Sequence, residues 1–187
     1  MMDNKERILE ATISVFNKKG LKFTMDDIAS ELSMSKKTIY TVFRDKESLF
    51  FSMVDYCFGK IADDKDAVLH DDSLSTVEKL RKVLCVLPEG YKEIDISKLY
   101  LLKDKYPKTY FKVQERLENG WEGILLLIEK GIAEGTIRPI KPIIVKSMME
   151  ATIEHFFQRD ILVANGVSYN DALEEMVEIF INGIAVK

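Results

Sequence analysis

Apolar residues recur at helical spacing along almost the whole chain, and this feature limits the possible folds more than any other. A first helix that ends near Gly20 is indicated by one apolar stripe, made of Ile8, Leu9, Thr12, Val15 and Phe16. Alternation of apolar and polar residues never persists, and no Asn-Gly or Asp-Gly turn joins two β-branched runs. The sequence therefore predicts an all-α protein.

The composition is compatible with a buried core and argues against several classes of protein. Of the 187 residues, 47% are hydrophobic and 31% are charged, which is typical of a globular chain. The net charge of −4 argues against the generally basic surface of a non-specific nucleic-acid coat, although it leaves room for local basic patches. The first residues are charged and no apolar run follows them, so no signal peptide is expected. The longest stretch without a charged residue, Ile161 to Asn170, is too short to cross a membrane. The sequence therefore predicts a cytoplasmic protein.

Capping residues mark where the predicted helices begin. Thr24, with Asp27 three residues later, suits the start of a second helix, and Ser35 suits a third helix from Lys36 to about Phe43. Asp45 is placed to cap a fourth helix, which we expect to reach about Ile61.

An acidic connector is expected to follow the fourth helix, at 63–72. Ser75 and Glu78 then form a capping-box pattern for a helix that Pro88-Glu89-Gly90 ends. The remaining predictions are one helix from Pro107 to Glu134 that Gly120 and Gly123 could kink, a helix that opens at Pro142 and includes Ile161 and Leu162, and a last helix over 169–184.

Residues 25–44 fit a helix-turn-helix motif, in which two helices cross sharply over a tight turn. Ala29 supplies the small residue that the crossing needs, and the apolar residues face inward at the expected positions. On the third helix, the side opposite this apolar face carries Lys37, Tyr40, Thr41 and Arg44. Such a cationic face suits a DNA major groove, although a charged helix face taken alone is more often only solvated.

Lys46 gives a separate indication of DNA binding. It directly follows the predicted cap Asp45, at the positive end of a helix dipole, where a cation is mildly unfavourable. A nearby phosphate would be attracted by both the helix N-terminus and the ammonium. We therefore predict a phosphate contact for Lys46; the alternative is a Lys that points into water.

The stretch from Phe23 to Leu49, above all Thr-Ile-Tyr-x-x-Phe followed by Asp-Lys-Glu-x-Leu, resembles the DNA-binding signature of the TetR family of transcriptional regulators. The resemblance covers about residues 5–55 and implies an all-helical homodimer that binds a palindromic operator on double-stranded DNA. It implies groove contacts for Lys36, Lys37 and Tyr40, and phosphate contacts for Thr24, Thr38 and Lys46. With the outward and capping residues of the motif, the predicted DNA-binding set is Thr24, Ser35, Lys36, Lys37, Thr38, Tyr40, Thr41, Arg44 and Lys46.

Two residues depart from the family's common pattern. Ser33 stands where Gly is usual, so we expect a slightly strained turn, and Lys37 stands where Gly is frequent. A long, charged side chain at 37 would set the groove contact, so the operator sequence of relatives does not carry over.

The resemblance implies two domains, a DNA-binding domain over 1–46 and an effector-binding and dimerisation domain over 47–187. An aromatic-rich middle of the chain could line an apolar pocket for a small-molecule effector, with hydroxyl and indole donors for orientation. The predicted ligand-binding residues are Tyr91, Tyr100, Tyr110, Trp121 and His155. Aromatic residues at helical spacing are more often plain core, and a His on an apolar helix is more often a core or interface residue.

The last two long helices carry more apolar surface than one core contact needs. The last helix is either sunk deep in its own domain or part of a symmetric helix-helix dimer interface, and the two-faced helix before it favours the dimer. The predicted interface residues are Met148, Phe156, Leu173, Met176, Val177, Phe180 and Ile184.

Signals of catalysis are lacking in the sequence. It has no Gly-rich phosphate loop, no G-x-S-x-G and no H-E-x-x-H, and its two histidines, His70 and His155, are far apart. The acidic run at 63–72 lacks the ligand spacing and turn Gly of a calcium loop, and the cysteines have no C-x-x-C pairing. We expect a regulator without cofactor, metal or enzyme activity; the alternative is a helical module that binds an acidic protein partner.

Overall fold

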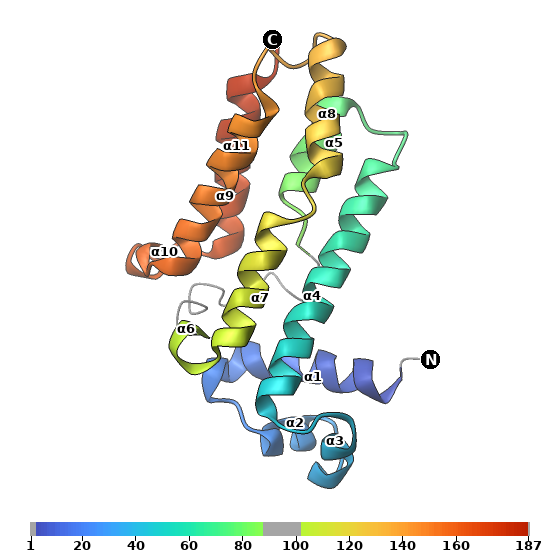
Figure 1. Ribbon diagram of the computed structural model, residues 1–187, viewed down its shortest axis with the longest axis vertical. Helices are drawn as coiled ribbons and strands as arrows, with labels where there is room; N and C mark the ends of the chain where they lie inside the picture. Colours follow the sequence, from blue (N-terminus) through green and yellow to red (C-terminus); the bar gives the residue numbers. More distant parts are fainter. Residues whose placement is uncertain (1–2, 88–101, 187) are drawn as a thin grey trace.

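The computed structural model describes residues 3–87 and 102–186, and within them the chain is helical apart from one isolated bridge between Ile137 and Ala185 (Figure 1). The all-α prediction is confirmed. One end of the molecule is formed by α1 (Asn4–Lys19), the short 3₁₀ turn η1 (Gly20–Lys22), α2 (Met25–Glu31) and α3 (Lys36–Val42). The long helix α4 (Lys46–Leu69) leads from this end into the rest of the molecule.

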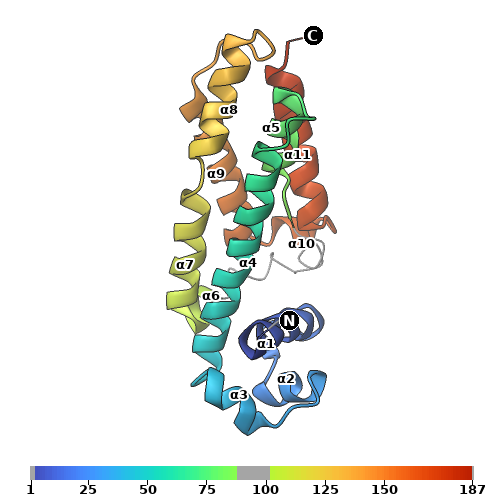
Figure 2. The same cartoon turned by 90° about the vertical axis from the view of Figure 1, so that its right-hand side faces the viewer.

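The remaining helices form an upright bundle above α1–α3. They are α5 (Thr76–Leu84), α6 (Leu102–Lys105), α7 (Pro107–Glu118), α8 (Glu122–Ala133), α9 (Pro142–Gln158), α10 (Ile161–Ala164) and α11 (Tyr169–Ile184). Figure 2 shows α7 and α8 following one another along the length of the bundle, with α9 and α11 reaching the same upper end as α8. This arrangement separates the α1–α3 end from the upper bundle and leaves α4 and α7 as the main connections.

The helix starts predicted from the capping residues are confirmed. The Thr24 hydroxyl accepts a hydrogen bond from the Asp27 amide at 3.2 Å, and the Ser35 hydroxyl accepts one from the Thr38 amide at 3.1 Å. The Asp45 carboxylate accepts from the Ser48 amide at 2.7 Å. Each cap satisfies a helix N–H group that has no partner within its own helix, so the chain enters α2, α3 and α4 at defined residues.

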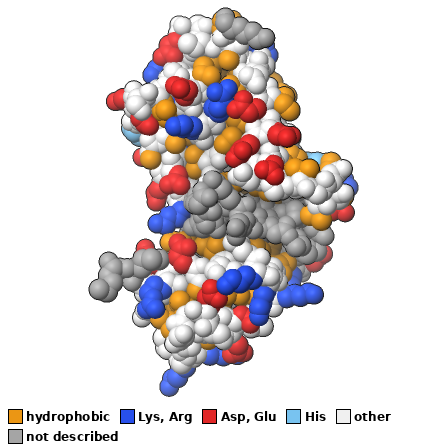
Figure 3. Space-filling view, turned by 180° about the vertical axis from the view of Figure 1, so that it is seen from behind, with side chains coloured by type: hydrophobic (Ala, Val, Ile, Leu, Met, Phe, Trp, Pro, Cys, Tyr) orange, Lys and Arg blue, Asp and Glu red, His pale blue; other side chains and the backbone are white. Residues whose placement is uncertain are grey.

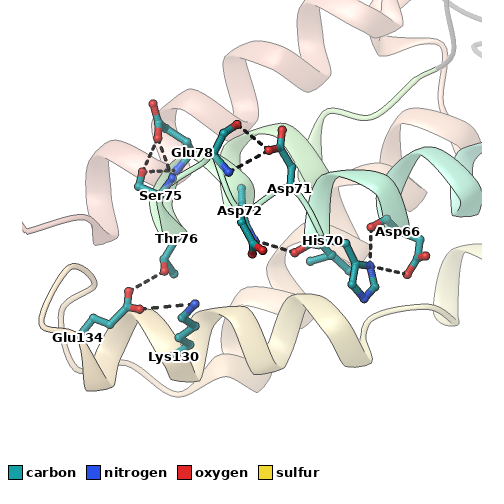
Figure 4. Close-up of polar contacts among 12 residues, drawn as sticks. Asp66, His70, Asp71, Asp72, Ser75, Thr76, Glu78, Lys130 and Glu134 are labelled. Atoms are coloured by element: carbon teal, nitrogen blue, oxygen red, sulfur yellow. Dashed lines mark hydrogen bonds and ion pairs between the residues drawn. The ribbon is translucent and has the colours of Figure 1, made fainter.

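The acidic connector predicted after the fourth helix is wrong in its first half. Residues Asp63 to Asp66 lie within α4, which ends at Leu69, because no Pro or Gly interrupts the helix there and acidic side chains are tolerated on an exposed helix face. Figure 4 shows how the helix ends: the His70 ring lies 2.9 Å from the Asp66 carbonyl oxygen and 3.3 Å from its carboxylate. The turn follows, in which the Asp71 carboxylate accepts from the Ser73 amide at 3.0 Å.

The single kinked helix predicted from Pro107 is instead two helices, α7 and α8. Gly120, between them, has φ +79°, a left-handed conformation that ends a right-handed helix and that Gly adopts readily. The helix from Pro142 similarly ends at Gln158, so Ile161 and Leu162 belong to the separate α10. The expected end of α5 at Pro88 to Gly90 lies outside the described residues, and α5 itself ends at Leu84.

Two apolar cores hold the fold. The first joins α1–α3 to the lower half of α4, and it also contains Tyr106, Tyr110 and Val113 from α7 and the residue before it. At its centre Phe50 is fully buried, with its ring 5.3 Å from that of Phe16 and 5.5 Å from that of Tyr106. The second core joins the upper bundle through α5, α8, α9 and α11.

The turn between α2 and α3 is strained, as the Ser at position 33 indicates. Ser33 has φ +51°, the one positive φ at a non-glycine among the described residues.

Replacement of Ser33 by Gly should raise the free energy of unfolding by about 1 kcal/mol, because a left-handed conformation is unfavourable for a residue with a Cβ atom. Urea denaturation of Ser33→Gly measures the effect. Ser30→Gly, at an exposed position in the last turn of α2, is the matched control and should lower stability. A Ser33→Gly protein less stable than its parent would contradict a strained turn.

Candidate nucleic-acid interface

The helix-turn-helix predicted over 25–44 is formed by α2 and α3. Ile28 and Ile39 are fully buried where the two helices meet, and Ala29 is 9% exposed beside them. The Met34 amide donates to the Ala29 carbonyl at 2.9 Å and closes the turn. Burial of one face of α3 leaves its opposite face exposed, at the outer end of the molecule (Figure 1).

Lys37 and Tyr40 lie on this exposed face and make no polar contact with the described residues. Tyr40 is 44% exposed, which is unusual for an aromatic side chain without a partner. The neighbouring Thr41 hydroxyl donates to the Thr38 carbonyl at 2.6 Å, and Arg44 reaches the carboxylate of Asp45 at 3.0 Å while its side chain stays 90% exposed. Lys37 and Tyr40 are therefore the side chains most available to base edges.

Three other predicted DNA-binding residues are already bonded: Lys36 and Ser35, which are exposed, and Thr38, which is partly buried. The Lys36 ammonium donates to the Asp26 carboxylate of α2 at 2.8 Å, and this hydrogen bond raises the pKa of Lys36. The Ser35 and Thr38 hydroxyls lie 2.8 Å apart at the start of α3. These contacts tie α3 to α2 and define its first turn, so they orient the exposed face.

Thr24 is exposed at the start of α2, where a phosphate contact was predicted. Its partner in the capping box, Asp27, also accepts a hydrogen bond from the Lys19 ammonium at 2.6 Å. That bond, with the hydrogen bonds from Thr24, lowers the pKa of Asp27 to about 2. The Asp27 carboxylate of the capping box is therefore ionised at neutral pH, next to the Lys19 ammonium.

Two of the three N–H donors of the Lys46 ammonium are used within the chain, and the predicted phosphate contact stays a prediction. The Lys46 Nζ atom donates to the Leu21 carbonyl at 2.9 Å and to the Phe23 carbonyl, and it lies 3.8 Å from the centre of the Phe23 ring. Burial, with repulsion from Lys105, lowers its pKa to about 8. Through these hydrogen bonds Lys46 links the start of α4 to the segment before α2. Its position in the sequence did not indicate this structural role.

Of the predicted ligand-binding residues, the three that the structure describes do not line one cavity. Trp121 lines a cavity of about 340 Å³ within the upper bundle, but its indole N–H donates to the Leu117 carbonyl at 3.1 Å, so it offers a ligand an apolar ring and no donor. Tyr110 is buried in the first core, and His155 is exposed on α9 and does not line the cavity, so it is not a core residue, while its alternative as an interface residue stays a prediction. Tyr91 and Tyr100 lie outside the described residues.

The lining of this cavity also contains polar residues that the sequence did not single out, among them Lys65 and Tyr169. Lys65 follows Phe58, Ile61 and Ala62 on one side of α4, and all four line the cavity. A Lys seven residues after the first member of an apolar stripe is the signal that could have found it. Tyr169 begins α11, and burial raises its pKa.

The predicted dimer interface is partly wrong. Leu173, Val177 and Ile184 are 4%, 0% and 5% exposed within the second core of their own chain, so they are unavailable to a partner. The side of α11 that carries these three residues is therefore buried in its own domain, as the alternative prediction stated. Met148 is 54% exposed, whereas Phe156, Met176 and Phe180 are partly buried.

An exposed apolar groove lies between α9 and α11, with a volume of about 210 Å³, and three of the predicted interface residues, Met148, Phe180 and Ile184, line it. Its lining includes Ile144 and Met148 of α9, each 54% exposed, and Ile179 of α11, which is 76% exposed. Apolar side chains of this size at such exposure are a common mark of a protein interface.

On the face seen in Figure 3, acidic and basic side chains are both present, and several Lys and Arg side chains lie around the α1–α3 end. Among the described residues no group of three or more His, Cys, Asp and Glu side chains could hold a metal ion. None of the described helices is both long enough and apolar enough to cross a membrane.

Comparison with known proteins places the helix-turn-helix in a family. Residues 8–53 match the family described as bacterial regulatory proteins, tetR family. The chain is 25% identical to the uncharacterised HTH-type transcriptional regulator YvaF of Bacillus subtilis strain 168, over 96% of this chain and 94% of that protein.

Solved structures share the fold over nearly the full length. A transcriptional regulator from Saccharomonospora viridis in complex with choline has a TM-score of 0.69 and 19% identity, over 98% of both chains. AibR in complex with isovaleryl coenzyme A and operator DNA has a TM-score of 0.62 and 18% identity, over 95% of this chain and 97% of AibR.

Proposed function

We propose that this chain, a DNA-binding transcriptional regulator of the TetR family, binds a palindromic operator as a homodimer and is released from it by a small molecule. The observation that carries the proposal is the exposed face of α3, where Lys37 and Tyr40 have no polar partner among the described residues. A lysine can donate to guanine in the major groove, and α3 is held in place by α2 and by its own caps. AibR, which has the same fold, is in complex with operator DNA.

The groove between α9 and α11 supports the homodimer. Its apolar residues are exposed in the single chain and would be covered by the same surface of a second copy, as a two-fold interface requires. A two-fold dimer would present two copies of α3, which fit one face of a duplex when they lie about one helical turn of DNA apart. The operator is therefore expected to be a palindrome.

Helix α4 supports control by an effector. Its first half packs in the first core with α1–α3, through Leu49, Phe50 and Met53, and its second half lines the cavity through Phe58, Ile61 and Lys65. A ligand that prefers a different position of α4 would change the distance between the two α3 helices of a dimer. The S. viridis relative with choline and AibR with isovaleryl coenzyme A are examples of this fold with small molecules bound.

This function implies a cytoplasmic repressor, and the family consists of regulatory proteins rather than enzymes. The proposed domain boundary stays at residue 46, although the first core extends beyond it. A helical module that binds an acidic protein is the second candidate, and it rests on the same exposed Lys and Arg side chains of α3. Specific binding to duplex DNA separates the two.

Lys37→Ala is expected to weaken binding to the operator by about 5–150-fold, which corresponds to about 1–3 kcal/mol for one base contact. Binding to random duplex should change little, because that binding depends on phosphate contacts. The operator is first obtained by selection of bound genomic fragments and footprinting, and affinities are then measured by fluorescence anisotropy at several salt concentrations.

The matched control for this measurement is Lys60→Ala, which removes one positive charge from an exposed position of α4, away from α3. It should leave operator affinity close to that of the parent. Equal affinities for the Lys37 variant and the parent would show that α3 does not read the operator through this residue. Absence of any specific duplex in the selection would favour the protein-binding alternative.

A further inference from the structure

The cavity of about 340 Å³ between α4, α5, α7, α8, α9 and α11 has walls that are mostly apolar. Its volume lies at the lower end of the range of small-molecule sites. The apolar side chains of the wall come from every one of these helices or the segments that join them, and include Phe58, Ile61, Leu69, Leu84, Trp121, Ile153, Phe157 and Leu173. Such walls favour an aliphatic or aromatic body of modest size.

One ammonium group is part of this apolar surface. Lys65 lines the cavity from α4 and has no hydrogen bond or ion pair with any described residue. Its burial lowers its pKa, because removal from water disfavours the charged form. A Lys in such surroundings is stabilised by an anion placed beside it.

The other charged residues of the described lining do not pair with the Lys65 ammonium. Asp66 is the one acidic residue among the described lining, and its carboxylate lies 3.3 Å from the His70 ring on the exposed side of α4 (Figure 4). Arg116, a second cation of the lining, forms an ion pair with Asp55, and its buried Nε atom has no hydrogen-bond partner. The described lining therefore offers cationic donors, and no free carboxylate that would hold a cationic ligand.

We propose that this cavity binds a small amphipathic carboxylate, with its apolar tail against the aromatic and aliphatic wall and its carboxylate beside Lys65. The identification of the cavity as the effector site rests on the proposed function, but the binding preference is a property of the cavity itself. Tyr169 is on the same lining, and its hydroxyl, which has no hydrogen-bond partner among the described residues, is a further donor available to a ligand.

The test compares octanoate, octanol and octylamine, which share one tail and differ in the charge of the head group. Trp121 is the only tryptophan in the chain and lines the cavity, so its fluorescence reports binding in the absence of DNA. Octanoate is expected to bind at least ten-fold more tightly than octanol or octylamine. Equal binding of octanoate and octanol, tighter binding of octylamine, or no saturable signal with octanoate would overturn the proposal.

Lys65→Met tests the role of the ammonium, because it keeps the length of the side chain and removes the charge. The variant should bind octanoate at least ten-fold more weakly and bind octanol as the parent does. Thermal unfolding should show a melting temperature no lower than that of the parent, since the replaced cation is partly buried and has no partner among the described residues. Lys60→Met, on the same helix but outside the cavity lining, should keep the parent's affinity for octanoate; loss of affinity in both variants or in neither would overturn the assignment to Lys65.

Operator binding in the presence of octanoate distinguishes this proposal from the proposed function. Octanoate that binds near Trp121 with the predicted preference, yet leaves operator affinity unchanged, would support the carboxylate site and contradict its role as an effector site. A specific operator complex from a protein that does not prefer octanoate would support the DNA-binding function and overturn the carboxylate site.

Discussion

Replacement of Ile179 by Glu is expected to convert the protein from dimers to monomers and to remove most of its affinity for a palindromic operator. Ile179 is 76% exposed in the single chain and lines the groove between α9 and α11. In a two-fold interface each copy contributes this residue, so the variant would bury two carboxylates without partners. An unpaired buried charge costs about 3–5 kcal/mol, which raises the dissociation constant by more than about 100-fold.

Sedimentation velocity over a range of concentrations measures the dimer, and anisotropy with the selected operator measures DNA binding. The exposure of Ile179 means that the single chain should fold normally, which circular dichroism checks. Leu126→Glu is the matched control, because Leu126 is 65% exposed on α8 and does not line the groove. A dimer of unchanged strength in the Ile179 variant would place the interface on another surface.

Phe50→Ala is expected to lower the free energy of unfolding by about 3–5 kcal/mol, the usual range for removal of a fully buried Phe. The ring of Phe50 contacts those of Phe16, Phe23 and Tyr106, so its loss leaves a void where α1, α4 and the start of α7 meet. Guanidinium denaturation followed by circular dichroism gives the value.

Phe111→Ala provides the comparison for this measurement. The side chain of Phe111 is 65% exposed on α7, so its replacement should change stability by less than about 0.5 kcal/mol. Similar losses in the two variants would mean that Phe50 does not occupy the centre of the first core.

Local signals predicted the α1–α4 region well. The caps at Thr24, Ser35 and Asp45 act through hydrogen bonds to residues three positions away, so the sequence contains both partners of each contact. The inward residues Ile28 and Ile39 were found for the same reason, since helical spacing alone decides which side they occupy.

Contacts between distant parts of the chain could not be predicted in this way. The bonds of Lys46 reach carbonyl groups 25 and 23 residues earlier, and backbone acceptors leave no mark in the sequence. The sequence placed Val177 in the predicted dimer interface and left Ile179 out, and only packing in the second core shows that Val177 is covered within its own chain while Ile179 is exposed. Asp63 to Asp66 were predicted to be a connector because of their charge. An exposed helix face can carry the same acidic residues, so charge does not distinguish the two.

The first core has a consequence for the construction of chimeric regulators from this chain. A chimera joined at residue 46 would keep α1–α3 but lose Phe50, Tyr106 and Tyr110, which complete their apolar surroundings. The transplanted segment would then expose apolar surface and is expected to aggregate rather than fold independently. An exchange of operator specificity between this regulator and a relative should therefore be limited to the outward residues of α3, which leave both cores intact, or should include α4 and the start of α7 together with the first three helices.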